Sequence, residues 1–394
     1  MPFGDQKGLV TTSVERTIFD ADHDAFRQSV RGFLEKEAVP YVGEWEAAGM
    51  PDPAFWVKAA AQGFVGFEAP EQYGGVGVSD FRFNAILNEE AMYLGVSGDS
   101  FQLQNDCILP YLTDLATEDQ KSRWLPRFTA GKFVGALGMT EPSTGSDLRG
   151  IRTRAKPCDG GWIVNGAKTF ITSGIQADFV ILVAKTGDDE DPNALSLFIV
   201  ESGMPGFHRG RKLDKIGHRG QDTAELFFED VFVPVDNLLG QIGQGMAHLR
   251  TKLARERLAI AVGAVAAAEA TLRLTVDYVS ERHAFGRPIG TFQGTRFALA
   301  PLATEVAALR CYTDQAILAH NAGQLSATEA AGLKALSTEL HWRVVDRGLQ
   351  LHGGYGYMEE YEIARRWRDA RVLRIYGGTT EIMWDIVGRA LHRS

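Results

Sequence analysis

The sequence predicts a mainly helical α+β protein in which two helical parts flank a part rich in β-strands. Three observations carry this prediction. Apolar residues recur at helical spacing over much of the first 130 residues. Between Gly138 and Val233 they instead form short runs bounded by glycine, proline and aspartate, which is typical of strands. After Gly243 come three long segments with few helix-breaking residues, as in helices that pack at shallow angles in a bundle.

A chain of 394 residues is long enough for two or three domains. We therefore expect three domains in chain order. They are an N-terminal helical domain over residues 1–136, a middle β domain of barrel or sandwich type over residues 137–243, and a C-terminal four-helix bundle over residues 244–394.

The helices of the two outer domains follow from their apolar spacing and their ends. Residues 22–39 form the first predicted helix, which Pro40 closes. Residues 80–94 and 117–130 repeat the pattern, and the latter begins with a capping box from Thr117 to Gln120. In the last domain, the predicted helices cover residues 246–282, 295–322 and 327–351.

The strands of the middle domain are shorter and are bounded by turn residues. The runs Trp162–Val164 and Thr169–Thr172 flank Asn165-Gly166, which predicts a tight hairpin with a type I′ turn. Further strands are predicted over residues 179–184, 195–201 and 224–233.

Composition and charge exclude several functional classes. Apolar residues make up 45% of the chain and charged residues 23%, the balance of a globular protein. A formal charge of −9 argues against nucleic-acid and membrane-surface partners, because both are anionic. The longest uncharged apolar stretch, residues 258–268, is shorter than the roughly 18 residues of a membrane span. Residues 1–13 lack the apolar core of a secretory signal.

The cysteines and histidines support the same expectation. Cys107, Cys158 and Cys311 are odd in number and scattered, which fits reduced thiols better than disulfides or a zinc site. The nine histidines form no pair at metal-ligand spacing, so we expect no metal. The sequence also lacks the G-x-G-x-x-G and P-loop phosphate cradles, a nucleophile elbow and H-E-x-x-H. We expect a cytoplasmic protein without a membrane span.

The segment Gly138–Asp147 opens the β domain and is rich in hydroxyl side chains and glycine. Such a segment can hydrogen-bond a heteroaromatic ring or a phosphate. Composition alone would favour an ordinary loop. The order of its residues, however, resembles the flavin loop T-E-P-x-x-G-S-D of the acyl-CoA dehydrogenases.

Five further strings resemble that family and follow in the family's order. They are Asn165–Thr172, Gly217–Pro234, Arg282–Gly286 with Phe292-Gln293, Gln350–Tyr357 and Tyr376–Ile382. Because six strings in order span residues 138 to 382, the sequence is identified as a member of the acyl-CoA dehydrogenase family by resemblance. The resemblance implies a FAD cofactor, an acyl-CoA substrate and a separate electron-transfer flavoprotein as the electron acceptor.

The resemblance also assigns contacts residue by residue. Those to the flavin half of FAD fall on Leu137, Met139, Thr140, Gly145, Ser146, Phe170, Ile171, Thr172, Thr379, Thr380 and Glu381. Those to the adenosine and diphosphate half fall on Arg282, Phe285, Gln293, Gln350, Gly353 and Gly354. Those to acyl-CoA fall on Ser146, Leu253, Arg257 and Gly378.

Some of these positions indicate how the protein assembles, and others differ from the usual family residues. Arg282 and Phe285 are expected to serve a FAD held mainly by another protomer, which implies a homo-oligomer, most simply a tetramer built from dimers. The alternative for Arg282 is a solvated charge at a helix end. Many members have tryptophan where Phe170 stands, and many have an acidic CoA contact at the position of Ala254.

The catalytic base is the residue that departs most from the family. Much of the family has a glutamate between the tyrosine and glycine of its last string, and this chain has Gly377 there. A second carboxylate, Glu256, lies on one apolar helical stripe with Leu249, Leu253 and Ile260. A carboxylate in such a stripe is costly unless it is paired or functional. The alternative to a functional role is an ion pair with Lys252, four residues earlier.

The long-chain and isovaleryl branches of the family place their catalytic glutamate in a Leu-x-x-Glu-Arg-Leu context, which residues 253–258 match. By this resemblance Glu256 is the base, and the backbone N–H of Gly377 donates to the thioester oxygen. The expected reaction oxidises a fatty acyl-CoA to its trans-2-enoyl-CoA, as in β-oxidation. The alternatives are an oxygen-using flavin oxidase or monooxygenase on the same fold, and a non-catalytic CoA-binding subunit. The sequence leaves the acyl chain open, although the last string favours a medium-to-long one.

Overall fold

The computed structural model describes residues 15–96, 101–187 and 195–392 of the chain. The prediction that residues 1–13 hold no secretory signal lies outside these residues. The chain forms two compact units, each assembled from separate segments. We call them the helical unit (Met1–Glu35, Phe81–Gly98 and Arg257–Ser394) and the sheet unit (Lys36–Asp80 and Asp99–Glu256). The three domains predicted in chain order remain a prediction.

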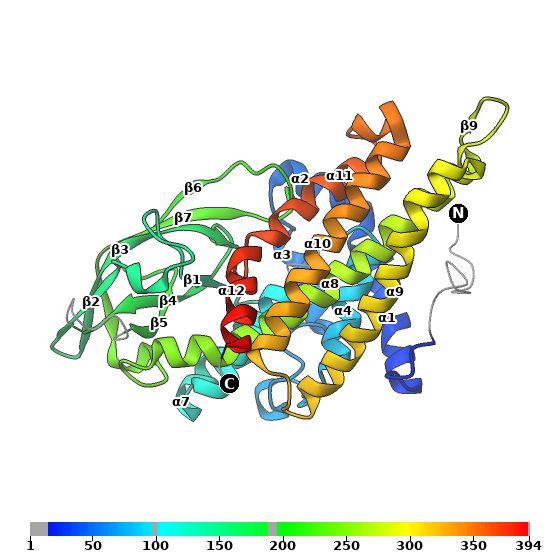
Figure 1. Cartoon of the computed structure of the whole chain (residues 1–394). Helices are drawn as coiled ribbons and strands as arrows, with labels where there is room; N and C mark the ends of the chain where they lie inside the picture. The colour runs from blue at the N-terminus through cyan, green and yellow to red at the C-terminus, as the bar shows by residue number, and fades with distance from the viewer. Residues whose placement is uncertain (1–14, 97–100, 188–194, 393–394) are drawn as a thin grey trace. The chain divides into compact units, whose positions relative to one another are not determined.

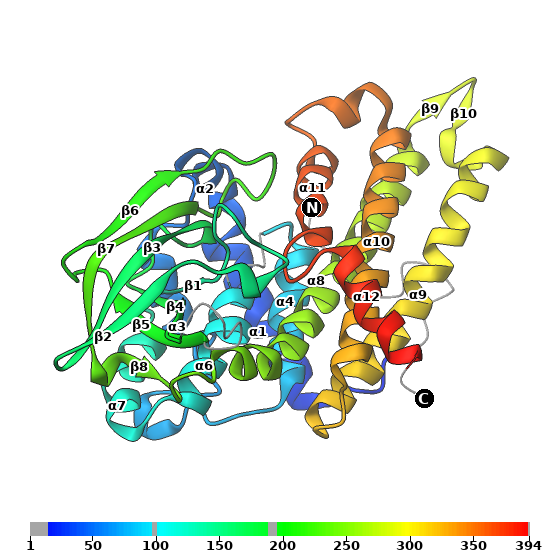
Figure 2. The same ribbon diagram turned by 60° about the vertical axis from the view of Figure 1, so that its left-hand side comes forward.

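The helical unit contains the long helices predicted in the last part of the chain, together with shorter ones (Figure 1). They are α1 (Ala21–Glu37), α4 (Phe81–Tyr93), α9 (Gln293–Asn321), α10 (Ala327–His352), α11 (Glu362–Ala370) and α12 (Thr380–Leu391). The longest helix, α8 (Gly245–Glu281), begins in the sheet unit and continues into the helical unit at Arg257. Two short strands, β9 (His283–Ala284) and β10 (Arg287–Pro288), form a hairpin between α8 and α9 (Figure 2).

The sheet unit holds one eight-stranded sheet and several shorter helices. Its strands follow the order β6-β7-β3-β2-β4-β5-β8, and β1 pairs with β4. They are β1 (Gly135–Gly138), β2 (Arg154–Cys158), β3 (Gly161–Thr172), β4 (Phe179–Lys185), β5 (Leu195–Glu201), β6 (Phe207–Lys212), β7 (Thr223–Pro234) and β8 (Leu238–Leu239). Its helices are α2 (Val42–Ala48), α3 (Pro53–Ala61), the π-helix Gln102–Ile108, α6 (Leu109–Leu115) and α7 (Glu118–Thr129).

Most predicted elements are confirmed, and the capping box of Thr117 and Gln120 is present in both directions at the start of α7. The hairpin predicted at Asn165-Gly166 is wrong. Both residues lie inside the continuous strand β3, at a register shift of its pairing with β7. The glycine is needed for close packing rather than for a turn, because a Cβ on Gly166 would lie 2.7 Å from the Cα of Thr153. The hairpin turn before β3 is Asp159-Gly160, where Gly160 has φ +75°.

The core of the helical unit surrounds the apolar part of α8. Leu258, Ala259, Ala261 and Val262 are buried against residues of α4, α9 and α10. By length and composition alone, α8 could cross a membrane, but 72% of its most apolar 18-residue window is buried within the protein. That burial is typical of a core helix.

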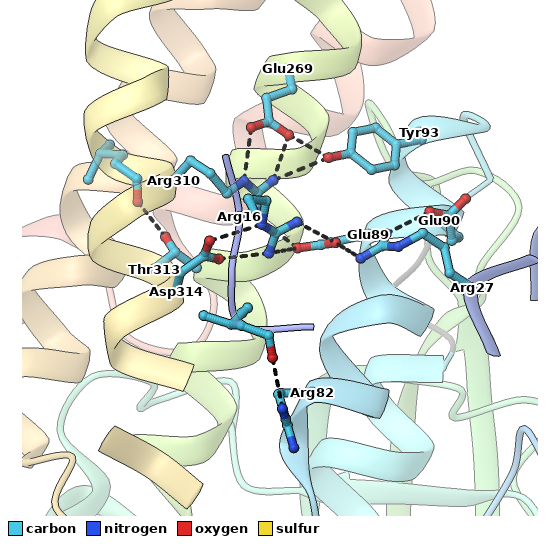
Figure 3. Close-up of polar contacts among 12 residues, drawn as sticks. Arg16, Arg27, Arg82, Glu89, Glu90, Tyr93, Glu269, Arg310, Thr313 and Asp314 are labelled. Atoms are coloured by element: carbon cyan, nitrogen blue, oxygen red, sulfur yellow. Dashed lines mark hydrogen bonds and ion pairs between the residues drawn. The ribbon is translucent and has the colours of Figure 1, made fainter. Parts of the chain in front are cut away.

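The helical unit also buries a cluster of ion pairs (Figure 3). At its centre is Glu89 of α4, whose side chain is fully buried and accepts hydrogen bonds from three guanidinium groups. They belong to Arg16, Arg27 and Arg310, at 2.9, 2.8 and 2.8 Å. The cluster joins the segment before α1, α1 itself, α4 and α9 by interactions that apolar packing alone would not supply.

Candidate active site

The loop that follows β1 is held against β3 by a buried lysine. The ammonium of Lys168 on β3 donates to the carbonyl of Met139 (3.1 Å) and to Oε1 of Glu141 (2.8 Å). The N–H of Thr169 donates to the carbonyl of Thr140 at 2.9 Å. Burial lowers the pKa of Lys168 to about 8 against the opposing effect of Glu141. The predicted flavin loop is therefore a fixed edge of the sheet unit rather than a free surface loop.

The residues expected to face the flavin ring present an open surface beside this loop. Phe170 has φ +58° and its side chain is 67% exposed, although it lies within β3. This rare backbone conformation for a non-glycine residue coincides with the second register shift between β3 and β7. Thr140 and Thr172 are partly exposed, and their hydroxyls make no hydrogen bond to another part of the described chain. An exposed aromatic ring near uncommitted hydroxyls fits a heteroaromatic ring such as flavin.

Glu256 is buried at the point where α8 leaves the sheet unit, and only 5% of it is exposed. The fully buried Tyr111 donates its hydroxyl to Oε1 of Glu256 at 3.4 Å. Burial, and then the charge of Glu256, raise the pKa of Tyr111 well above its ordinary value, so the phenol stays protonated as a donor. Lys252, the partner in the ion-pair alternative, instead forms its salt bridge with Asp114 of α6.

The turn before α12 contains Gly377 and Gly378, both with positive φ (+63° and +97°). Its carbonyls face two cationic side chains of the helical unit. Nε of Arg257 lies 3.5 Å from the carbonyl oxygen of Gly377, and Nζ of Lys334 on α10 lies 2.7 Å from that of Gly378. A Cβ on Gly377 would lie 2.5 Å from Cδ1 of Ile260, so a side chain at this position requires Ile260 to move.

The end of α12 nearest this turn carries the last three residues of the predicted flavin contact. Thr379 is the N-cap of α12 and accepts from the N–H of Ile382 at 3.3 Å, while Thr380 and Glu381 form the first turn. Hydrogen bonds at this helix start, from the backbone and from Thr379, lower the pKa of Glu381. The helix N-terminus therefore fixes the three residues relative to the glycine turn.

The predicted adenosine and diphosphate contacts gather at the other end of the helical unit. The guanidinium of Arg282 lies 5.6 Å from the ring centre of Tyr355, and the hydroxyl of Tyr278 donates to the carbonyl of His352 at 3.1 Å. These contacts bring the end of α8 to the turn that contains Gly353 and Gly354. A Cβ on either glycine would meet open space, so the turn presents bare backbone on which a ligand can rest.

The remaining predicted residues differ in exposure. Gln350 is exposed at the end of α10, and Gln293 is exposed at the start of α9. Phe285, at the tip of the β9–β10 hairpin, is 95% exposed and has φ +53°. Leu137 and Leu253 are partly buried, Ile171 is buried, and Gly145 and Ser146 are exposed.

Three residues of the candidate site escaped the sequence analysis. Lys168 and Lys334 are fully buried lysines, and Tyr111 is a buried phenol. Lys334 had a detectable signal, because it lies at helical spacing from the buried apolar residues Ala330, Ala331 and Val345 of α10. That reasoning is the same as the reasoning that singled out Glu256. The contact between Tyr111 and Glu256 joins residues 145 positions apart and has no local signal.

The chain resembles known proteins over nearly its whole length. Family models of the acyl-CoA dehydrogenase N-terminal, middle and C-terminal domains match residues 20–132, 136–231 and 243–392. The chain belongs to the acyl-CoA dehydrogenase family. The family, the fold class and the enzyme class predicted from the sequence are thereby confirmed.

Individual relatives of this acyl-CoA dehydrogenase family member indicate its branch. A long-chain specific acyl-CoA dehydrogenase of Sus scrofa is 44% identical over 95% of the chain and 88% of the relative. An isovaleryl-CoA dehydrogenase of Oryza sativa subsp. japonica is 34% identical over 97% and 94%. The long-chain and isovaleryl branch expected from residues 253–258 is therefore the branch of these relatives.

Solved structures of the family share the fold. An acyl-CoA dehydrogenase from Geobacillus kaustophilus has a TM-score of 0.94 and 45% identity, over 96% of this chain and all of that one. A glutaryl-CoA dehydrogenase from Mycobacterium smegmatis, solved in complex with FADH2, has a TM-score of 0.88 and 26% identity, over 96% of both chains. The members of the family are FAD flavoproteins. The similarity of this chain to long-chain members supports oxidation of a fatty acyl-CoA by this enzyme.

Proposed function

We propose that the enzyme converts a fatty acyl-CoA to its trans-2-enoyl-CoA with Glu256 as the base that removes the α-proton. The observation that carries this proposal is a buried carboxylate, 5% exposed, in a chain whose last family string has a glycine in place of the usual glutamate. Burial away from water suits a base that must bind a carbon-bound proton. When bound, FAD supplies the acceptor for the hydride that leaves the β-carbon.

The neutral phenol of Tyr111 supports this role of Glu256. A donor that stays protonated orients the carboxylate without removing its charge. The alternative to a catalytic role was an ion pair of Glu256 with Lys252. Lys252 instead forms its salt bridge with Asp114, which weakens that alternative. Glu256 and Ile260 are one helical turn apart on α8, and Ile260 lies beside Gly377.

The backbone N–H of Gly377 would donate to the thioester oxygen, where negative charge develops as the proton leaves. Its left-handed backbone and its carbonyl contact with Arg257 give the turn a defined shape. Ser146, Leu253, Arg257 and Gly378 would hold the rest of acyl-CoA, as the resemblance implies.

The residues present fit FAD. The open aromatic and hydroxyl surface at Phe170, Thr140 and Thr172 would hold the flavin ring, and the bare turn at Gly353 and Gly354 would hold the adenosine. The exposed Phe285 and Arg282 would reach the FAD of a second protomer, so we propose a homotetramer built from dimers. We further propose a cytoplasmic location, an electron-transfer flavoprotein as acceptor, and a medium-to-long acyl chain.

The test is anaerobic titration of the yellow holoenzyme with saturated acyl-CoA of four to eighteen carbons. Bleaching of the flavin that air reverses slowly is the expected result, since a dehydrogenase passes its electrons to a protein acceptor. Rapid reoxidation with formation of hydrogen peroxide would instead indicate the oxidase alternative. No bleaching with any chain would support the CoA-binding subunit, and specificity constants that peak at four or five carbons would contradict the chain-length proposal.

A further inference from the structure

Lys334 is a fully buried lysine whose ammonium meets a backbone carbonyl. Its side chain lies on the core-facing stripe of α10, and 0% of the residue is exposed. Within the described residues, its ammonium donates one hydrogen bond, to the carbonyl oxygen of Gly378 at 2.7 Å, and forms no salt bridge. A buried ammonium with so few partners destabilises a fold. An apolar side chain of similar length would be the more stable choice for this position.

A second cation lies at the same turn. Arg257 of α8 is 7% exposed, and its Nε lies 3.5 Å from the carbonyl oxygen of Gly377. The two consecutive carbonyls of the glycine turn therefore face two cationic side chains from two different helices. Because both glycines have positive φ, the turn is intrinsically adaptable, and these contacts restrict the directions of its peptide groups.

The carboxylates near Lys334 are engaged elsewhere. Glu339, also on α10, pairs with Arg374 at 2.6 Å and accepts from the hydroxyl of Thr380 at 3.1 Å. Glu381 lies in the exposed first turn of α12. Burial, and then the charge of Arg257, lower the pKa of Lys334 to about 7, while Glu339 and Glu381 oppose this change. The free-energy cost of burying this lysine is therefore not offset by a salt bridge within the described residues.

We propose that Lys334 is a positioning residue for the reaction: by holding the carbonyl of Gly378, two peptide groups beyond the N–H of Gly377, it fixes the shape of the glycine turn and so keeps that N–H directed at the thioester oxygen. The inference rests on the proposed role of Gly377. A neutral amine still donates a hydrogen bond, so the positioning persists when Lys334 loses its proton. What the side chain supplies is a donor at a fixed distance from α10.

The test compares wild type with Lys334→Met, which keeps an unbranched side chain as far as Cε and removes the terminal donor. The limiting rate of anaerobic flavin reduction by acyl-CoA is expected to fall about tenfold or more, because a misdirected oxyanion donor loses much of its effect. The dissociation constant of acyl-CoA should change by less than about threefold, since the remote contacts are intact. The melting temperature should stay equal or rise.

A second measurement does not depend on turnover. A 3-oxoacyl-CoA binds as its enolate, and a flavin next to an enolate gives a long-wavelength absorption band. If Lys334 directs the donor at the thioester oxygen, the band forms at higher pH in Lys334→Met than in wild type. The control is Thr338→Val, one turn further on α10, which removes a buried hydroxyl bonded only to helix carbonyls. It should lower the melting temperature slightly and leave the band and the rate unchanged.

The outcomes separate the two proposals. If wild type does not reduce its flavin with any acyl-CoA, the proposed function fails. If wild type is active and Lys334→Met is within about twofold of it in rate, with the band at the same pH, the positioning role alone is wrong. A Lys334→Met enzyme that loses both stability and rate shows a structural role and also overturns the proposal. If this variant does not fold, Lys334→Gln replaces it; one atom shorter, it should lose the hydrogen bond and the rate.

Discussion

Removal of one charge from the buried cluster of Figure 3 should destabilise the helical unit strongly. Glu89 accepts from Arg16, Arg27 and Arg310, all within 3.0 Å, and its side chain has no exposed surface. Glu89→Gln keeps the shape of the side chain but leaves three guanidinium groups around a neutral amide, whose NH2 would face a donor. Breaking a buried ion pair by loss of one partner costs about 3–5 kcal/mol.

The melting temperature converts this free energy into an observable. For a cooperative unit of about 150–250 residues, 1 kcal/mol shifts the melting temperature by about 2–4 °C, so Glu89→Gln should lower it by about 6–20 °C. The control is Glu305→Gln, which breaks the pair with Arg343 on the surface of the same unit. The side chains of that pair are 45% and 50% exposed, so its loss should cost under about 1 kcal/mol. Calorimetry and denaturant unfolding measure both variants.

The pH dependence provides an independent check. Burial alone would raise the pKa of Glu89, but Arg16, Arg310 and Arg27 together hold it far below its ordinary value of 4.5. A depressed carboxyl pKa contributes stability that is fully present above the ordinary value and is lost progressively as the pH falls from that value to the depressed one. The difference between wild type and Glu89→Gln should therefore be full at pH 7 and shrink below about pH 4.5. A variant within about 2 °C of wild type at pH 7 would refute the reasoning.

Three further predictions follow from the candidate site. Since burial and Arg257 lower the pKa of Lys334 to about 7, the unfolded chain binds more protons between pH 7 and 10.5, and the free energy of unfolding should rise across this range by up to about 1.4 kcal/mol per pH unit. Denaturant unfolding from pH 7 to 9.5 should show a steeper rise in wild type than in Lys334→Met, in which Lys168 still contributes to the rise. Arg282→Ala should weaken FAD retention and dimerisation together, and a variant that keeps its full FAD content at high dilution would contradict the shared site. Adding Gly377→Glu to Glu256→Gln should restore part of the rate of flavin reduction only when Ile260→Val removes the obstructing Cδ1, and equal rates with and without Ile260→Val would count against this geometry.

The sequence predicted the main features of the fold because they depend on local patterns. The helical spacing along α8 placed Leu249, Glu256 and Ile260 on one stripe, and all three are buried. The error at Asn165-Gly166 arose because a glycine can serve a turn or a close approach of two backbones, and only the position of Thr153 distinguishes these uses.

The parts of the site that were missed depend on long-range contacts. Glu89 and Arg310 are 221 positions apart, and no local pattern pairs them. Lys168 and its neighbour Thr169 on β3 are both buried, and the burial of Lys168 follows only from the packing of the predicted flavin loop on β3. The family strings at residues 138–382 predict contacts that propensity and spacing cannot supply, and those contacts stay predictions.

The base assignment is tested most directly by anaerobic single-turnover reduction of the bound flavin in wild type and Glu256→Gln. Glutamine keeps the size of the side chain and can still accept from Tyr111, so FAD content and acyl-CoA binding should be unchanged. The rate of flavin reduction should fall by about 10²–10⁴-fold, which is typical of the removal of a general base, so that nearly all turnover is lost. A Glu256→Gln enzyme that reduces its flavin within about tenfold of wild type would contradict the account and leave Glu256 with a structural role only.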